Sequence, residues 1–214
     1  IKVALQYFFN KGEKKTTIIA FENAFHGDTF AAMAASGISF YTLAFQSMMI
    51  DVVRIPVPVV GQEDVSFDAL AEVLKNHNCA GFIYEPLVQG AAGMVMYEPA
   101  TLDTLIRMCK ENNVLTIADE VMTGFGKTGK TFASDYLAEQ PDMMCLSKAL
   151  TGGTIPMAIT TFTQPIFDAF YDEDINKALF HGHTFTANPT GCAAALASLE
   201  LLQTPEMQAN ILRV

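Results

Sequence analysis

Several apolar runs of this sequence end in side chains that could take part in catalysis. A lysine follows the run MMCLS, and acidic residues close the runs VLTIAD and AGFIYE. An aromatic residue and a histidine follow the run TIIAF after a short link. The lysine is Lys148, the two acids are Asp119 and Glu85, and the last pair is Phe25 and His26. If the runs are strands of one parallel sheet, these side chains lie along the same edge, where such sheets bind ligands.

The lysine needs an explanation, because a buried ammonium is costly unless its pKa falls or it finds a partner. An amine kept dry enough to be partly neutral can form a Schiff base with a carbonyl. An aspartate facing the ring nitrogen of pyridoxal phosphate keeps that nitrogen protonated, and an aromatic side chain can stack on the ring. Lys148, Asp119 and Phe25 match these three roles.

Each of these residues also has a purely structural interpretation. Lys148 could simply pair with Asp119, and His26 could be a hydrogen-bonded histidine of the core. Asp119 and Glu120 could be a helix cap and a surface carboxylate. The loop GFGKTG lacks the spacing GxxxxGK[ST] of a P-loop, which argues against a nucleotide hydrolase.

Short apolar runs alternate with amphipathic helical stretches, the pattern of βα units that build a mostly parallel sheet. Several runs are apolar on nearly every residue, so helices should cover both faces of the sheet. The pattern therefore predicts one α/β domain. Its expected strands are Thr17–Phe21, Asp51–Ile55, Ala80–Glu85, Val114–Asp119, Met143–Ser147 and Met157–Phe162.

Three helices have recognisable starts. Ser66 is expected to cap the helix FDALAEVLKNHN, and Pro99 lies near the first turn of a second helix. Asn188 and Pro189 open the helix TGCAAALASLELL. Gly191 and other small residues of this last helix would let another backbone approach closely.

The composition limits the possible partners. Of the 214 residues, 50% are hydrophobic and 17% charged, which is enough to build a sizeable core. The net charge of −10, without a basic run, argues against nucleic acid and membrane surfaces as partners. No apolar run is long enough to span a bilayer. The four cysteines are Cys79, Cys109, Cys145 and Cys192. Their wide spacing indicates reduced thiols in a cytoplasmic protein.

Three motifs occur in the order and spacing of a known family. They are IADEVMTGFGKTG around Asp119, LSKALTGG around Lys148, and HGHTFTANPTGCAAALASLELL. By these motifs the chain resembles, over essentially its whole length, the class III (subgroup II) pyridoxal-phosphate aminotransferases of fold type I. AFHGDTFAAM, EPLVQGAAGMVMYEP and LTGGTIPMA are most similar to one branch of this family. That branch transfers an amino group from S-adenosylmethionine to 8-amino-7-oxononanoate in biotin synthesis, by a ping-pong reaction.

The resemblance implies a fold and roles for individual residues. The fold is the large domain of fold type I, a mostly parallel sheet of the seven-stranded type between helices. Lys148 would bond to the cofactor and move the proton, and Asp119 would pair with the ring nitrogen. Val121 would pack on the ring face opposite Phe25, and His26 would also contact the cofactor. Phe25 stands where the branch often has tyrosine, which keeps the stacking and removes a hydroxyl.

Further residues match substrate contacts of the family. Asp28 matches an acid of the substrate pocket, and Glu85 matches a carboxylate near the cofactor with a mixed structural and gating role. Lys127 stands where the branch often has arginine, so a bidentate contact is not expected there.

In the family, the HGHTF segment reaches the active site of the second subunit. Thr184 would bind the cofactor phosphate there, while Gly182 and His183 line the pocket. This implies a homodimer with shared active sites that acts on small molecules.

The chain opens in helical periodicity without an initiator methionine, so it is expected to be a piece of a longer protein. The family has a Gly-Ser phosphate cup upstream of such a helix, and an arginine for the substrate carboxylate in a C-terminal domain. Residues 1–214 would then be the cofactor-binding large domain. Another class III aminotransferase for ω-amino acids or diamines, or a truncated module without activity, are the alternatives.

Overall fold

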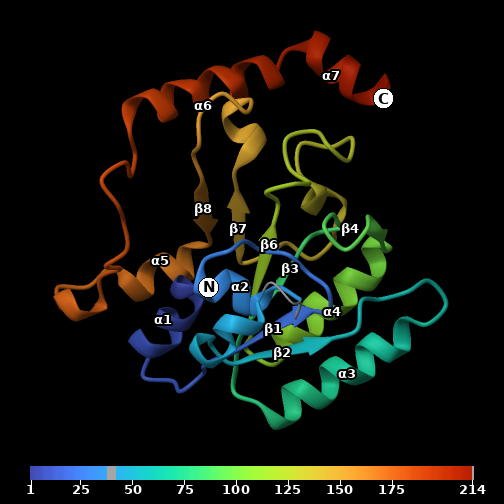
Figure 1. The fold of residues 1–214 in the computed structure, drawn as a ribbon, viewed down its shortest axis with the longest axis vertical. Helices are drawn as coiled ribbons and strands as arrows, with labels where there is room; N and C mark the ends of the chain where they lie inside the picture. Colours follow the sequence, from blue (N-terminus) through green and yellow to red (C-terminus); the bar gives the residue numbers. More distant parts are fainter. Residues whose placement is uncertain (38–41, 214) are drawn as a thin grey trace.

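A six-stranded sheet in the order β2-β1-β3-β6-β7-β8 forms the centre of the computed structural model, which describes residues 1–37 and 42–213 (Figure 1). Neighbouring strands are parallel, except that β7 and β8 are antiparallel. Strands β4 and β5 form a separate antiparallel hairpin. The strands are β1 (Thr17–Phe21), β2 (Val52–Ile55), β3 (Cys79–Tyr84), β4 (Val88–Gln89), β5 (Val95–Met96), β6 (Leu115–Asp119), β7 (Met143–Leu146) and β8 (Ile159–Phe162).

The predicted apolar runs become the six strands of this sheet. The run Thr17–Phe21 matches β1 at both ends, and the others differ by a residue or two. The α/β class and the mostly parallel sheet are confirmed. The described residues contribute six strands to the main sheet, where seven were expected. In the last predicted run, Met157–Phe162, the strand begins only at Ile159, because the hydrogen-bonded pairing with β7 ends at the pair Leu146 and Ile159.

Helices cover both faces of the sheet, as strands that are apolar throughout require. Along β1, Ile19 and Phe21 pack with α3 and α4, whereas Ile18 and Ala20 pack with α1 and α5. All four side chains are fully buried, and each large one contributes roughly 1.5–3 kcal/mol to folding. The helices are α1 (Lys2–Asn10), α2 (Phe30–Ala35), α3 (Glu63–Asn76), α4 (Pro99–Glu111), α5 (Gln164–Phe170), α6 (Pro189–Leu202) and α7 (Pro205–Arg213).

Two of the three predicted helix starts are confirmed. Pro99 begins α4, and the Asn188 side chain caps α6 by accepting a hydrogen bond of 2.7 Å from the backbone N–H of Gly191. The prediction for Ser66 is wrong, because α3 begins earlier and Ser66 is buried within it. Glu63 lies in the first turn instead, where a negative charge interacts favourably with the helix dipole.

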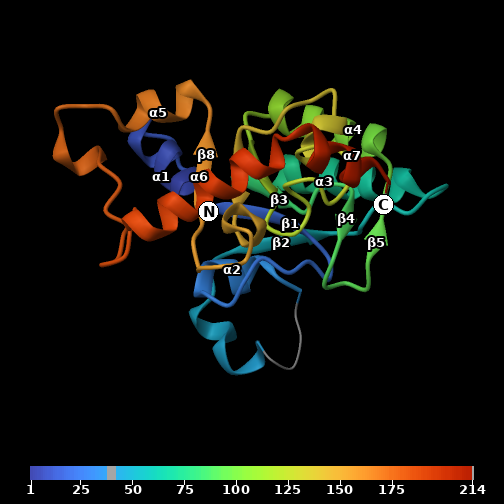
Figure 2. The same cartoon turned by 90° about the horizontal axis from the view of Figure 1, so that it is seen from above.

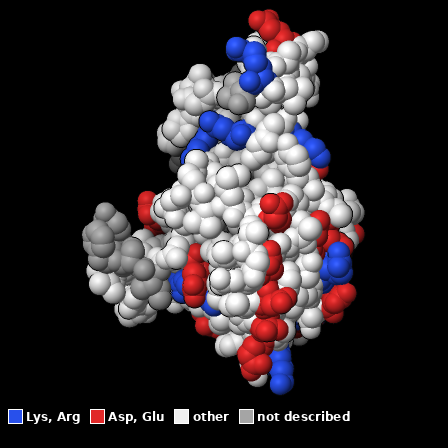
Figure 3. Space-filling model, turned by 90° about the vertical axis from the view of Figure 1, so that its right-hand side faces the viewer, with Lys and Arg blue, Asp and Glu red and all other residues white. Residues whose placement is uncertain are grey.

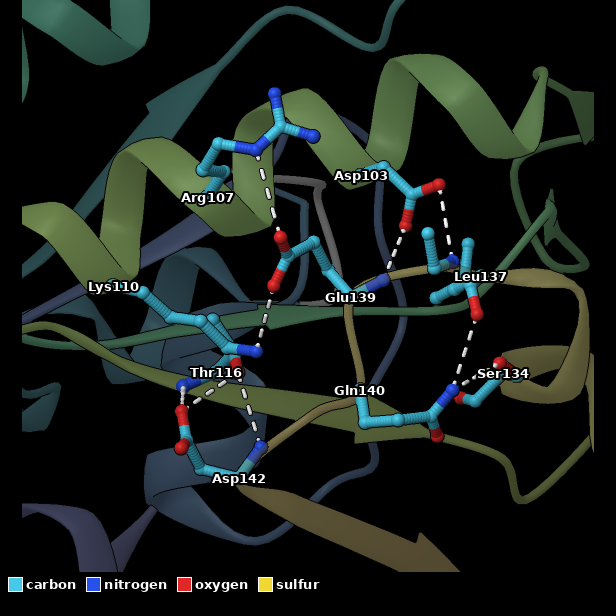
Figure 4. A network of polar contacts seen from close by, with 10 residues as sticks. Asp103, Arg107, Lys110, Thr116, Ser134, Leu137, Glu139, Gln140 and Asp142 are labelled. Atoms are coloured by element: carbon cyan, nitrogen blue, oxygen red, sulfur yellow. Dashed lines mark hydrogen bonds and ion pairs between the residues drawn. The ribbon is translucent and has the colours of Figure 1, made fainter.

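A network of polar contacts holds the segment that leads into β7 against helix α4 (Figure 4). Asp103 of α4 accepts hydrogen bonds from the backbone N–H groups of Ala138 (3.2 Å) and Glu139 (2.9 Å). The Glu139 carboxylate also pairs with Lys110 of α4 at 3.0 Å. These contacts fix the path of the chain as it approaches β7.

The same network joins the first residues of β6 to the start of β7. The Asp142 carboxylate accepts hydrogen bonds of 2.8 Å from both the backbone N–H and the hydroxyl of Thr116 (Figure 4). Since β6 ends at Asp119, this contact lies at the opposite end of the strand from the predicted site.

The last part of the chain is more exposed than the rest. All residues of β8 are exposed, and in α6 only Gly191 is buried. Helices α6 and α7 lie beyond the end of the sheet toward which β7 points (Figures 1 and 2). Their contact with the rest of the molecule runs mainly through the turn that follows β7.

The surface reflects the acidic composition. On the face in Figure 3, acidic side chains are spread over the lower half, and basic side chains stand at the top and along the edges. Among the described residues, no helix has the length and the apolar character needed to cross a membrane.

Candidate active site

A cavity of about 170 Å³ opens at the carboxyl ends of β3, β6 and β7, beside the segment that follows β1. It brings together six predicted residues from segments that follow four separate strands, as the sequence led us to expect. Its lining residues are Phe25, His26, Gly27, Glu85, Ala91, Asp119, Val121, Met122 and Lys148.

Asp119, the last residue of β6, is held from two sides. Its Oδ2 atom lies 2.8 Å from Nδ1 of His26, and its Oδ1 atom accepts a hydrogen bond of 3.1 Å from the backbone N–H of Val121. Because a carboxylate oxygen can only accept, the Nδ1 atom of His26 carries the proton in this contact. The carboxylate is therefore fixed in direction at the wall of the cavity.

His26 has a buried side chain that is hydrogen-bonded through Nδ1, but it is not the fully satisfied core histidine of the structural alternative. Its side chain is only 1% exposed, yet within the described part of the chain its Nε2 atom has no hydrogen-bond partner. The backbone N–H of His26 donates to the Ser36 hydroxyl at 3.0 Å, which holds the residue in place. One ring nitrogen thus faces Asp119, and the imidazole is positioned by both its side chain and its backbone.

Lys148 begins the 3-10 turn Lys148–Thr151 that directly follows β7 and Ser147. The expectation of a buried ammonium is wrong, because Lys148 is exposed. Its backbone instead adopts the left-handed conformation, with φ of 49°. For a residue with a side chain this conformation costs about 1–2 kcal/mol. Gly152 and Gly153 continue the turn with φ of 62° and 76°.

Lys148 does not pair with Asp119, so this structural alternative is also wrong. Both residues line the cavity, but within residues 1–37 and 42–213 the Lys148 amine forms no ion pair or hydrogen bond. Asp119 takes His26 as its partner instead. The amine is therefore available to a ligand in the cavity.

Glu85 lies next to β3 and is 5% exposed. Its carboxylate accepts hydrogen bonds from the backbone N–H groups of Gly90 (3.0 Å) and Phe25 (3.5 Å). Burial raises the pKa of the Glu85 carboxyl above its ordinary value, although the Gly90 N–H acts in the opposite direction. Glu85 thus connects two loops that line the cavity.

Glu120 is neither a cap nor a surface carboxylate. It is fully buried and accepts hydrogen bonds from the Thr123 hydroxyl (2.6 Å) and from the backbone N–H groups of Ala133 (3.1 Å) and Ser134 (2.7 Å). These contacts fold the segment after β6 back on itself. Val121 and Met122, which line the cavity, belong to that segment.

The remaining predicted site residues do not line this cavity. Asp28 and Lys127 are exposed on the loops after β1 and β6, and the HGHTF segment is exposed as well. Its three predicted residues are Gly182, His183 and Thr184.

Sequence reasoning missed two features of the cavity. The first is the contact between His26 and Asp119, which the placement of both residues after strands could have suggested. The second is the close packing of Met122 on Gly90. A Cβ atom on Gly90 would clash with the Met122 sulfur. The glycine-rich stretch LVQGAAG was the available signal for such a close approach.

The residues present fit pyridoxal phosphate. Lys148 offers an amine without a partner in the described chain, and Asp119 offers a carboxylate already oriented by His26. Phe25 lines the cavity and is 47% exposed, so its ring has a free face for stacking. Val121 adds an apolar contact on the same cavity.

The sequence matches the family described as Aminotransferase class-III over residues 1–214. It is 44% identical to an adenosylmethionine-8-amino-7-oxononanoate aminotransferase of Synechococcus elongatus, over 96% of this chain and 50% of that protein. A protein of the same description from Geobacter sulfurreducens is 37% identical over 97% of this chain and 49% of its own length. The chain thus spans about half the length of the curated relatives it matches.

Solved structures agree with these matches. The crystal structure of adenosylmethionine-8-amino-7-oxononanoate aminotransferase from Methanocaldococcus jannaschii has a TM-score of 0.89 and 35% identity, and the match covers 98% of this chain and 49% of that one. The ornithine aminotransferase of Toxoplasma gondii has a TM-score of 0.82 and 28% identity, and the match covers 97% of this chain and 46% of that one. The chain therefore belongs to the class-III aminotransferase family.

Proposed function

We propose that this chain is the cofactor-binding large domain of a pyridoxal-phosphate-dependent aminotransferase. The observation that carries the proposal is the cavity in which Lys148, Phe25, Val121 and the pair of Asp119 with His26 meet. A free amine, an oriented carboxylate and a stacking surface are the groups that this cofactor needs from a protein. The family match over the whole chain supports the same conclusion.

Bound pyridoxal phosphate supplies a conjugated ring that takes up the electrons left behind when a proton leaves the substrate carbon. Asp119 would hold a proton at the ring nitrogen, and His26 fixes the direction of the Asp119 carboxylate. Phe25 and Val121, which line the cavity, would confine the ring. These residues act by orientation, so their geometry must exist before the substrate arrives.

Lys148 has two tasks in this proposal. Its amine would hold the cofactor by a bond to the aldehyde carbon and, when free of that bond, would act as the general base that moves a proton. Within the described residues the Lys148 amine has no hydrogen-bond or ion-pair partner, so its nitrogen is available to a ligand in the cavity. Its position at the end of β7 brings it to the same cavity as Asp119.

For the whole protein we propose S-adenosylmethionine as the amino donor and 8-amino-7-oxononanoate as the acceptor, in biotin synthesis. The names of the Synechococcus and Geobacter relatives support this assignment. A second candidate is another class III activity, because an ornithine aminotransferase and an omega transaminase have similar folds, with TM-scores of 0.82 and 0.88. Their identities of 28% and 27% are lower than that of the Synechococcus relative.

We further propose that the protein is a cytoplasmic homodimer with shared active sites. The exposed position of Gly182, His183 and Thr184, outside the cavity of their own chain, supports a role at the cavity of a second copy. Among the substrate contacts we retain Asp28 and Lys127, which lie exposed on loops next to cavity residues. All cysteines are free thiols, in keeping with a reducing compartment.

The test is amino transfer by the full-length protein loaded with pyridoxal phosphate. It would be mixed with 8-amino-7-oxononanoate and one amine at a time: S-adenosylmethionine, ornithine, or 4-aminobutyrate. We expect mass spectrometry to detect the diamine product with S-adenosylmethionine, and no product with the Lys148→Ala variant. Product formation from ornithine or 4-aminobutyrate alone would support the second candidate. Absence of transfer with every amine would contradict the proposed acceptor.

A further inference from the structure

The left-handed backbone of Lys148 must be held by its surroundings, because an unconstrained lysine avoids this conformation. Part of the support comes from the turn itself. The backbone N–H of Gly153 donates to the carbonyl of Lys148 at 3.2 Å, and that of Leu150 donates to the carbonyl of Ser147 at 3.0 Å. These two bonds close the turn but do not attach it to the rest of the protein.

A first serine attaches the residue before the lysine. Ser147 is extended, with φ of −160° and ψ of −156°, and its hydroxyl donates to the carbonyl of Met157 at 2.7 Å. Met157 lies just before β8, whose pairing with β7 ends at Leu146 and Ile159. The Ser147 hydroxyl therefore continues the connection between the two strands by one more bond, directly next to Lys148.

A second serine attaches the residue after the lysine. Ser198 lies in the middle of α6, and its hydroxyl donates to the carbonyl of Ala149 at 3.0 Å. A Cβ atom on Gly152 would lie 3.7 Å from the Ser198 oxygen, so this glycine and the helix are in contact. Helix α6 makes its main contact with the body of the protein at this turn.

We propose that Ser147 and Ser198 are positioning residues that together hold Lys148 in the left-handed conformation, with its amine at the cavity. The inference rests on the proposed function, because the position of the amine matters only if it bonds to a cofactor. The two hydroxyls attach the residues on both sides of Lys148 to two different elements, β8 and α6. Without them, the lysine can relax to the ordinary conformation with negative φ, which turns its Cα–Cβ bond away.

The bond in question forms when the Lys148 nitrogen attacks the aldehyde carbon of pyridoxal phosphate. A carbon–nitrogen double bond replaces the carbon–oxygen double bond, and the oxygen leaves with two protons as water. Borohydride then adds hydride and fixes the bond, so that the modified lysine can be measured by mass spectrometry. The rate of this modification in the cofactor-free protein reports on how well the amine is positioned.

The experiment uses the full-length protein and compares Ser147→Ala, Ser198→Ala and Ser147→Thr with Thr154→Ala. Thr154 is the matched control, because its hydroxyl also donates to a carbonyl of this turn, that of Thr151 at 2.8 Å, without touching the residues beside Lys148. Threonine in place of Ser147 keeps the hydroxyl, and extended backbone accommodates its branched side chain.

We expect each serine-to-alanine variant to bond to the cofactor about fivefold more slowly, the effect of one lost hydrogen bond. Amide hydrogen exchange of the cofactor-free variants should be faster at Leu150 and Gly153 by a similar factor. The Ser147→Thr variant should keep the rate of the unchanged protein, and Thr154→Ala should leave the Lys148 rate unaltered.

The outcomes separate this inference from the proposed function. If the unchanged protein forms no bond at Lys148, the proposed function is wrong. If that bond forms but the serine variants react like Thr154→Ala, the serines do not position Lys148 and the inference is overturned. A Ser147→Thr variant as slow as Ser147→Ala would also overturn it, because the hydroxyl would then not be the cause.

Discussion

The Nδ1 atom of His26 lies 2.8 Å from the Oδ2 atom of Asp119, and the two residues reach each other from the ends of different strands. With the His26 side chain only 1% exposed, this pair is shielded from solvent. The histidine thus fixes the direction of the Asp119 carboxylate before any ligand binds.

We therefore predict that the His26→Ala variant of the full-length protein loses turnover by about tenfold to a hundredfold, since a hydrogen bond to a charged group is worth roughly 1.5–3 kcal/mol. Steady-state kinetics would measure the loss. His77→Ala is the control, because His77 is exposed just before β3, at the opposite end of that strand from the cavity. Equal kinetics of the two variants would show that His26 does not support Asp119.

Asp119→Ala is expected to retain some cofactor and to lower turnover by about a hundredfold to a thousandfold, because the carboxylate stabilises charge on the ring. Cofactor content by absorbance and turnover by product formation would be measured on the same samples. Asp64→Ala, which removes an exposed carboxylate from α3, serves as the comparison. Near-normal turnover of Asp119→Ala would refute the role of this residue.

Lys148→Ala should abolish the lysine modification that borohydride traps with pyridoxal phosphate. The reason is that Lys148 is the one lysine among the described residues that line the cavity. Peptide mass mapping would locate the modification. Lys75→Ala is the control, because Lys75 is exposed on α3. In this variant borohydride should still trap the cofactor on Lys148. An unchanged yield in Lys148→Ala would move the assignment to another lysine.

Glu85 should make stability depend on pH. Burial raises the pKa of its carboxyl above the ordinary 4.5, so the folded protein keeps this proton to higher pH than the unfolded chain. The favourable contribution of the protonated form is present below pH 4.5 and is lost as pH rises through the raised pKa.

The unfolding free energy of the unchanged protein, relative to Glu85→Gln, should therefore fall as pH increases above 4.5. Denaturant titrations of both proteins across this range would measure the difference. If the difference in unfolding free energy between the two proteins stays constant or grows with pH, burial does not raise the pKa of the Glu85 carboxyl.

Glu120→Gln should destabilise the protein by about 1–3 kcal/mol, because an amide cannot accept all the hydrogen bonds that the buried carboxylate accepts. Chemical denaturation gives the value. Asp135→Asn is the matched control, since this exposed carboxylate accepts one backbone N–H in the same segment, that of Phe132 at 2.8 Å. If both variants lose the same stability, burial of Glu120 contributes nothing special.

Much of the fold and the outline of the site could be predicted because they depend on short patterns. Apolar runs located the strands, and the rule for strand ends placed Asp119, Lys148 and Phe25 at one edge. The burial of Glu120 could not be predicted, because its donors Ala133 and Ser134 come back from a later part of the chain. Such contacts follow from tertiary packing rather than from local pattern.

Two errors have similar physical causes. Ser66 resembles a helix cap, but the acidic residues before it let the helix start earlier, and the serine became part of the buried face. Lys148 follows a buried strand, yet the left-handed turn directs it out of the interior. Nothing in the residue types before the lysine reveals its positive φ.

The cavity residues are attached to strand ends and buried partners, whereas Asp28 and Lys127 stand on exposed loops outside it. Substitutions at these two loop positions meet little packing resistance, while changes at Asp119 or His26 break a buried hydrogen-bonded pair. If Asp28 and Lys127 contact the substrate as proposed, descendants of such a protein can diverge in the molecules they accept and still inherit the same chemistry unchanged.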